Sequence, residues 1–276
     1  MGQLEVRPVT ALIGAEIHGV DLREPLSRDE IEAIERALFE YVVVFFRDQD
    51  ITPDQQVEFA AQFGEISIPP LTPKYPPPRP ELIVLDQTEP KGDGADRWHS
   101  DNTFMAEPPM GSVLKAIQLP KVGGDTCFAN MFAAWDALSE PMRELLEGLT
   151  ATHDIAMPLE RGVRGGHVDQ DVNALRQSWP PVSHPIGRKH PVTGRRALFV
   201  NSNSTSHIDG LSEAESDALL HFLCEHVRSP EFQCRLHWDT NSIAFWDNRS
   251  AQHYAVPDYR ERRIMHRVTI AGDRPV

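Results

Sequence analysis

The residues best placed for chemistry in this sequence form a short motif, His99-x-Asp101, in the stretch from Trp98 to Phe104. On an extended strand, side chains two residues apart point to the same face, so an imidazole nitrogen and a carboxylate oxygen would converge on one point. A distal histidine, His253, would add a second nitrogen. Two nitrogens and one oxygen on one side of a metal leave up to three positions open, the arrangement used by non-haem Fe(II) oxygenases.

Two arginines four residues apart, Arg263 and Arg267, follow the distal histidine. A guanidinium group matches a carboxylate with two parallel hydrogen bonds and keeps its charge. Residues four apart on a strand share one face, so both arginines can point toward the metal. Arg262 is one residue out of step and should lie on the opposite, solvated side. A structural salt bridge is the alternative role for Arg267.

Three ligands alone leave other classes of protein open. A zinc hydrolase also binds its metal through three such side chains and a water, and a metal-binding protein without turnover would need no more. Neither class has an evident need for the two arginines. Formation of succinate only when Fe(II), 2-oxoglutarate and O₂ are present together would separate a dioxygenase from both.

Several motifs, in order, resemble the taurine dioxygenase/TfdA family of Fe(II)- and 2-oxoglutarate-dependent dioxygenases. The resemblance covers nearly the whole chain. It implies Fe(II), 2-oxoglutarate and O₂ as the cofactor and co-substrates, and a double-stranded β-helix (jelly-roll) core. The motifs that carry it lie at residues 13–22, 43–47, 98–101, 123–126, 246–249 and 263–267.

The resemblance also implies roles for individual residues. It assigns the metal to the three ligands above and the distal carboxylate of 2-oxoglutarate to Arg263, with Thr126 bonded to the same group. In the taurine branch, the arginine that matches Arg267 holds the sulfonate of the substrate. Further candidates for contact with the substrate are Tyr75, Asn102 and Phe104.

The sequence departs from the taurine enzymes ahead of the metal motif. Those enzymes carry a histidine and a tyrosine there, whereas residues 68–75 contain no histidine and only Tyr75 matches the tyrosine. We therefore expect a small anionic organic substrate other than taurine. An alkyl sulfonate or a sulfate ester, releasing an aldehyde with sulfite or sulfate, is the first hypothesis. An aryloxyalkanoate or another small carboxylate is the alternative.

Residues around the ligands have less specific roles. Trp246 is expected to pack in the core, while Asp247 and Asn248 either form hydrogen bonds that orient His253 or form a turn. His207 is a candidate for the border of the substrate pocket. The remaining histidines lack ligand spacing and are interpreted as surface residues or as residues with structural hydrogen bonds.

Composition restricts the partners and the compartment. With 27 basic and 41 acidic residues the net charge is −14, which repels nucleic acid and anionic membranes. No apolar run approaches the roughly 18 residues of a membrane span, and the N-terminus has no secretory signal pattern. Three cysteines without C-x-x-C spacing indicate reduced thiols and the cytoplasm. Family analogy alone predicts self-association as a dimer or tetramer.

The elements that position these residues are mostly short strands with helices between them. We predict one domain over residues 1–276, mainly β with helices (α+β), with flanking helices and a lid insertion. Helices are expected after Ser27 and Thr52, twice within 131–148, and after Ser212. Two segments are candidates for a lid over the site. One is the proline-rich segment 69–80, and the other is the segment 158–181, which is expected to be irregular. Strands are expected at 4–8, 12–20, 42–46, 82–85, 112–117, 127–129, 182–186, 197–201, 233–238, 242–247 and 264–271.

Overall fold

A large mixed sheet forms one side of the computed structural model, which describes residues 4–68, 79–88, 90, 95–164 and 171–276. Its eight strands run in the order β1-β2-β3-β14-β6-β16-β4, and β5 also pairs with β16. All the pairings are antiparallel except that of β2 with β3. The strands are β1 (Glu5–Pro8), β2 (Ala15–His18), β3 (Val43–Phe46), β4 (Ile66–Ser67), β5 (Leu82–Gln87), β6 (Gly111–Gln118), β14 (Ile243–Asp247) and β16 (Arg263–Ile270).

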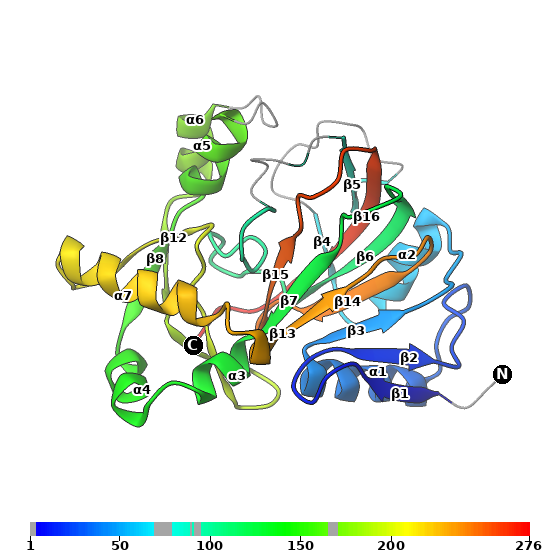
Figure 1. Ribbon diagram of the computed structural model, residues 1–276, viewed down its shortest axis with the longest axis horizontal. Coiled ribbons are helices and arrows are strands. Elements are labelled where there is room, and N and C mark those ends of the chain that lie inside the picture. The colour runs from blue at the N-terminus through cyan, green and yellow to red at the C-terminus, as the bar shows by residue number, and fades with distance from the viewer. Residues whose placement is uncertain (1–3, 69–78, 89, 91–94, 165–170) are drawn as a thin grey trace.

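A smaller antiparallel sheet lies against the inner face of the large one (Figure 1). It has the order β13 (Gln233–Leu236), β7 (Thr126–Asn130), β15 (Ala251–Ala255). Phe128 from the small sheet packs with Trp246 and Met265 from the large sheet in one buried cluster. The core of the protein therefore lies between the two sheets, and inward-facing residues of β16 point into it.

Two helices cover the outer face of the large sheet. Ser27 and Thr52 form capping boxes that start α1 (Arg28–Tyr41) and α2 (Pro53–Ala61), as the sequence predicts. The apolar sides of these helices pack on a second buried cluster that includes Val268 of β16. Alternate residues of β16 thus face the helices on one side and the small sheet on the other.

A long insertion separates β7 from β13. The two helices predicted within 131–148 are α3 (Met131–Asp136) and α4 (Glu140–Glu147). A three-stranded sheet, β12 (Thr205–Ile208), β8 (Thr150–His153) and β9 (Val182–Pro185), forms the centre of the insertion. The insertion also contains β10 (Gly187–Lys189), β11 (Arg196–Leu198), α7 (Glu213–His226) and a short 3₁₀ helix at Pro230–Phe232.

The prediction that residues 158–181 are irregular was wrong. They contain most of α5 (Ala156–Arg164) and all of α6 (Val172–Ser178), which lie beyond β8 and β12 in Figure 1. Both helices are short, and α5 contains Pro158 and Gly162, residue types with low helix propensity. They are stabilised by a small cluster in which Leu159 packs with Ile155 and Phe104. Residues 69–78 of the other lid candidate lie outside the described part of the chain.

The mixture of strands and helices agrees with the predicted fold class. Five of the described strands, β4, β8, β10, β12 and β15, were not predicted, and β15 carries His253. Among the residues that the structure describes, no helix is long and apolar enough to cross a membrane.

Candidate metal centre

His99, Asp101 and His253 converge at one buried point between the sheets. One ligand atom from each lies within 4.8 Å of the others. The Nε2 atoms of His99 and His253 are 3.8 and 3.9 Å from Oδ1 of Asp101. These separations are too long for hydrogen bonds, and they lie within the span of about 4.4 Å that one ion with bonds of about 2.2 Å can bridge.

The two histidines are brought together by their backbones. The N–H of His99 donates to the carbonyl of His253 at 3.1 Å, and the N–H of His253 donates back at 2.8 Å. This single antiparallel bridge attaches the first motif to the edge of β15, and the ring centroids lie 4.2 Å apart. The predicted pairing of a local motif with a distal histidine therefore has a direct structural basis.

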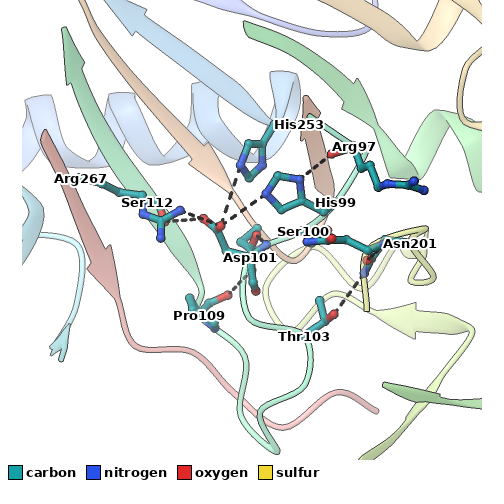
Figure 2. Close-up of polar contacts among 12 residues, drawn as sticks. Arg97, His99, Ser100, Asp101, Thr103, Pro109, Ser112, Asn201, His253 and Arg267 are labelled. Atoms are coloured by element: carbon teal, nitrogen blue, oxygen red, sulfur yellow. Dashed lines mark hydrogen bonds and ion pairs between the residues drawn. The ribbon is translucent and has the colours of Figure 1, made fainter. Parts of the chain in front are cut away.

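The hydrogen bond of His99 leaves the other ring nitrogen available for a metal. Its Nδ1 lies 2.7 Å from the carbonyl oxygen of Arg97 (Figure 2). Because a carbonyl only accepts, Nδ1 carries the proton and Nε2 presents its lone pair to the site.

His253 is also suited to bind a metal as a neutral ring. Its ring packs against Trp246 with centroids 4.7 Å apart. Burial, reinforced by the nearby ring of His99, lowers the pKa of His253 to about 3. The ring of His253 is therefore held in the neutral form that binds metals.

Asp101 does not lie on a strand, so the predicted strand geometry of the H-x-D pair was wrong. The chain leaves the bridge at His99 and turns through residues 101–104, with Asn102 in the left-handed region at φ +51°. The turn is fixed by Asn248, whose Oδ1 accepts from the Asp101 N–H at 2.7 Å and whose Nδ2 donates to the Asp101 carbonyl at 2.9 Å. The two ligands thus converge through a turn, not through the alternation of a strand.

The carboxylate of Asp101 is charged and held from one side. Arg267 donates to Oδ1 at 2.8 Å and Ser112 donates to Oδ2 at 3.2 Å, opposite the two histidines (Figure 2). Burial opposes ionisation of Asp101, but the charges of Arg267 and the histidines, with the Ser112 hydrogen bond, outweigh burial and lower the pKa to about 2. Asp101 is therefore an ionised carboxylate at neutral pH.

Arg263 and Arg267 share the inward face of β16, as predicted, together with buried Met265. Arg263 is buried, and its Nε donates to the carbonyl of Gly124 at 3.1 Å. Arg262 faces the other way and forms an exposed ion pair with Asp86 at 2.5 Å. The alternation of the strand therefore separates the two neighbouring arginines as the sequence predicts.

A glycine turn positions the end of β7 beside Arg263. Gly123 and Gly124 have φ of +83° and +78°, which favours glycine, and Asp258 accepts from the N–H of Gly124 at 2.8 Å. Two residues later, the buried Thr126 accepts a hydrogen bond from the indole N–H of Trp238 at 3.0 Å. The hydroxyl of Thr126 keeps its own proton to donate.

Among the residues that the structure describes, the other predicted site residues do not contact the three candidate ligands in the same direct way as Arg267. Phe104 is buried against the insertion, with its ring centroid 6.0 Å from that of Trp179. Asn102 is partly buried in the turn beside Asp101. Tyr75 lies outside the described residues. His207 is exposed and 3.6 Å from Asp209.

Of the two roles expected for Asp247 and Asn248, the structure supports the turn, which spans residues 248–250, and not the orientation of His253. Asp247 is fully buried and binds Arg249 at 2.7 Å and His190 at 2.8 Å. The Nδ1 of His253 has no hydrogen-bond partner among the described residues. The side chains of Asp247 and Asn248 form their hydrogen bonds with residues other than His253. The carboxamide of Asn248 is hydrogen-bonded to the backbone of Asp101.

Sequence reasoning missed several residues that hold the turn around Asp101. Ser112 bonds the carboxylate, and no local pattern marks a serine in a strand for that role. Thr103 is held from the insertion by Asn201 at 3.1 Å, by the ring of His153 at 2.9 Å, and through its carbonyl by His184 at 2.9 Å. These partners come from distant parts of the chain, so spacing gives no signal for them.

Comparison with known proteins agrees with this geometry. The family model described as "Taurine catabolism dioxygenase TauD, TfdA family" matches residues 5–269. The chain belongs to the TauD/TfdA family. This membership confirms the predicted enzyme class, a 2-oxoglutarate-dependent dioxygenase, which uses Fe(II), 2-oxoglutarate and O₂.

Relatives within the TauD/TfdA family match almost the whole chain. An alpha-ketoglutarate-dependent sulfate ester dioxygenase of Pseudomonas putida is 39% identical, over 99% of this chain and 91% of its own length. An alpha-ketoglutarate-dependent 2,4-dichlorophenoxyacetate dioxygenase of Cupriavidus pinatubonensis is 35% identical, over 98% of both chains. The crystal structure of a taurine dioxygenase from Burkholderia xenovorans superposes with a TM-score of 0.85 at 36% identity, over 99% of this chain and 92% of the other.

Proposed function

We propose that the enzyme hydroxylates a small organic anion, an alkyl sulfate ester or alkyl sulfonate, at the carbon that bears the anionic group. The observation that carries this proposal is the placement of a cationic side chain, Arg267, 2.8 Å from the carboxylate of the proposed metal ligand Asp101. A substrate anion bound by Arg267 would place its neighbouring C–H bond beside the metal. The sulfate ester dioxygenase relative supports the choice of substrate class.

The donor set fits Fe(II). We assign the metal to His99, Asp101 and His253, whose two neutral imidazoles and one carboxylate match the facial triad and converge in a buried site. When bound there, Fe(II) and 2-oxoglutarate together activate O₂ to hydroxylate a C–H bond, with succinate and CO₂ as by-products. The pKa of His253 is lowered by burial and that of Asp101 by Arg267, so the ring is neutral and the carboxyl is charged, as metal ligands require.

Arg263 and Thr126 are assigned to the distal carboxylate of 2-oxoglutarate. Arg263 is buried beside the glycine turn, where its Nε donates to Gly124. Because Arg263 is charged and lies where the dielectric is low, its hydrogen bonds to a carboxylate would be stronger than they are in water. Thr126 accepts from Trp238 and can donate its hydroxyl proton to the same carboxylate.

Arg267 is assigned to the substrate anion, with Asn102, Phe104 and Tyr75 as further candidates for contact. The net charge of the protein is −14, so a local cation is needed to bind an anion. Hydroxylation of a carbon attached to a sulfate or sulfonate group produces an unstable adduct that collapses to an aldehyde. The leaving group is sulfate from an ester and sulfite from a sulfonate.

An aryloxyalkanoate is the second candidate substrate, and the 2,4-dichlorophenoxyacetate dioxygenase relative favours it. A carboxylate would bind Arg267 by the same paired hydrogen bonds. Hydroxylation of the carbon beside the ether oxygen would then release a phenol. The two candidates therefore differ in their products and not in the ligands of the metal.

The wider description of the protein is proposed on the same basis. The two facing sheets support a double-stranded β-helix (jelly-roll) core, and the match of the family model to residues 5–269 supports one domain over 1–276. Three free cysteines support a reducing compartment, the cytoplasm. We also propose a dimer or tetramer by family analogy, which analytical ultracentrifugation would contradict by showing only a monomer.

The substrate is tested by a product assay with Fe(II), 2-oxoglutarate and air. Alkyl sulfates, alkyl sulfonates including taurine, and aryloxyacetates are compared for succinate, sulfate, sulfite and phenol, with His99→Ala as the blank. We expect succinate in step with sulfate or sulfite. Phenol from the aryloxyacetates alone would favour the second candidate, and no succinate above the blank with any compound would contradict the proposed function.

A further inference from the structure

The side chain of Asn248 bonds both peptide groups of the proposed metal ligand Asp101. Its Oδ1 accepts from the Asp101 N–H at 2.7 Å, and its Nδ2 donates to the Asp101 carbonyl at 2.9 Å and to the Pro109 carbonyl at 3.2 Å. Asn248 is fully buried. One carboxamide therefore satisfies three buried backbone groups of the segment that carries the ligand.

This contact matters because Asp101 is not held by a strand. His99 is fixed by its bridge to His253, but the backbone of Asp101 lies in a turn followed by Asn102 at φ +51°. A turn has no ladder of hydrogen bonds to define the position of its residues. The place of the Asp101 carboxylate relative to the two imidazoles therefore depends on the side chains that bind the turn.

Asn248 is itself held rigidly. Its own N–H donates to the carbonyl of Met110 at 2.8 Å. The preceding Asp247 is fixed by the ion pair with Arg249 and by His190, and all three side chains are buried. The carboxamide is thus presented from a turn at the end of β14 that has few alternative conformations.

The charged contacts of Asp101 do not replace this backbone clamp. Arg267 and Ser112 bind the carboxylate oxygens, so they act on the end of the side chain. Arg267 would follow the carboxylate if the turn moved, since its long side chain has many rotamers. The hydrogen bonds from Asn248 to the peptide groups instead act at the point from which the Asp101 side chain starts.

We propose that Asn248 is a positioning residue that sets the affinity of the metal site by clamping the backbone of Asp101. The proposal rests on the assignment of the metal ligands made above. Residues that orient metal ligands typically change metal affinity by about 10–100-fold when they are lost. A purely structural role would instead lower the stability of the fold and leave the affinity of the folded protein for metal unchanged.

Metal affinity is measured with Mn(II), which binds nitrogen and oxygen ligands without reacting with air, from the EPR signal of the free ion. We compare the wild type with Asn248→Ala and Asn248→Ser, the latter keeping a hydroxyl for one hydrogen bond. We expect about 10–100-fold weaker binding for Asn248→Ala and an intermediate loss for Asn248→Ser. Thermal unfolding without metal is recorded for every variant.

Asn130 provides the matched control. It is also buried and makes three hydrogen bonds to backbone groups, by capping α3 through Phe132 and Ala133 and by donating to Leu12. We expect Asn130→Ala to lower the unfolding temperature without weakening Mn(II) binding. Should Asn248→Ala fail to fold, Asn248→Ser gives the same comparison.

The outcomes separate this inference from the proposed function. Equal Mn(II) affinity in the wild type and both folded Asn248 variants, or an equal loss in Asn130→Ala, would overturn the positioning role. Selective weakening in the Asn248 variants would support it even if no tested compound yielded succinate. Absence of Mn(II) binding by the wild type would overturn the ligand assignment, and the positioning role with it.

Discussion

His99 and His253 exchange two backbone hydrogen bonds, of 3.1 and 2.8 Å, and hold their rings 4.2 Å apart between centroids. The bridge joins the segment before β6 to β15 in the smaller sheet. Asp101 then turns back toward β16, where Arg267 meets its carboxylate. The candidate site is thus assembled from three parts of the chain that the two sheets bring face to face.

Arg267→Gln should weaken the binding of an anionic substrate. Loss of a hydrogen bond to a charged group removes about 1.5–3 kcal/mol, so we expect KM for the substrate to rise about 10–100-fold while the Kd of 2-oxoglutarate changes little. Steady-state kinetics and a binding titration measure the two constants. Arg262→Gln, which removes an exposed ion pair with Asp86, serves as the control, and an equal rise in KM for that variant would contradict the assignment.

Arg263→Lys should weaken the binding of 2-oxoglutarate. Lysine retains the charge but lacks the planar fork that bonds a carboxylate at two points. We expect KM for 2-oxoglutarate to rise about tenfold or more, a loss of about 1.4 kcal/mol or more. The neighbouring substitution Arg262→Lys should have no effect on this constant, since Arg262 lies just before β16 and forms an exposed ion pair with Asp86. An unchanged KM in Arg263→Lys would remove this residue from the 2-oxoglutarate site.

Gly124→Ala tests whether the glycine turn positions Arg263. A Cβ at this residue would lie 3.2 Å from Cδ of Arg263, in addition to the strain at φ +78°. Gly210 has a similar φ of +80° with no atom within 4 Å of its Cβ position, so Gly210→Ala reproduces the backbone strain alone. We expect both variants to lose stability and only Gly124→Ala to bind 2-oxoglutarate more weakly, as measured by fluorescence or calorimetric titration. Equal binding by the two variants would contradict the positioning of Arg263 by the turn.

The metal-free protein should lose stability in mild acid because of His153. Burial, reinforced by the nearby His184, lowers the pKa of His153 to about 3, whereas an unfolded histidine has a pKa of about 6.5. Between these values the unfolded chain binds the additional proton. The neutral ring of His153 therefore contributes fully to the free energy of unfolding above about pH 6.5, and this contribution is lost as the pH falls toward 3. At pH 5 the loss is about 2 kcal/mol.

Urea unfolding at pH 7 and pH 5 measures this contribution. His153→Leu should reduce the difference in unfolding free energy between the two pH values, because it removes the buried titratable ring. His207→Leu, at an exposed position, should leave the difference unchanged. The same pH dependence in His153→Leu and the wild type would show that another group is responsible.

Local patterns in the sequence predicted the parts of the structure that short-range physics determines. Ser27 and Thr52 start helices through capping boxes, and alternation along β16 separates Arg262 from Arg263 and Arg267. The helices α5 and α6 were missed because their stability comes from packing against Phe104 and its neighbours. Pro158 and Gly162 within α5 also have low helix propensity.

The ligands of the candidate site were predicted, but the way they are held was not. Motif order identified His99, Asp101 and His253, although Asp101 reaches the site from a turn. The roles of Asn248 and Ser112 depend on contacts between segments far apart in the sequence. Such contacts depend on the register of the strands in the two sheets. Local patterns in one sequence do not reveal that register.

The most direct test of the metal centre is an anaerobic titration of the protein with Fe(II) and 2-oxoglutarate, followed in the visible spectrum. Coordination of 2-oxoglutarate to Fe(II) produces a charge-transfer band that neither component gives alone. We expect this band in the wild type and its loss in Asp101→Ala, while Arg262→Gln keeps it. Absence of the band in the wild type, or a band of equal intensity in Asp101→Ala, would contradict the assignment of His99, Asp101 and His253 as the metal ligands.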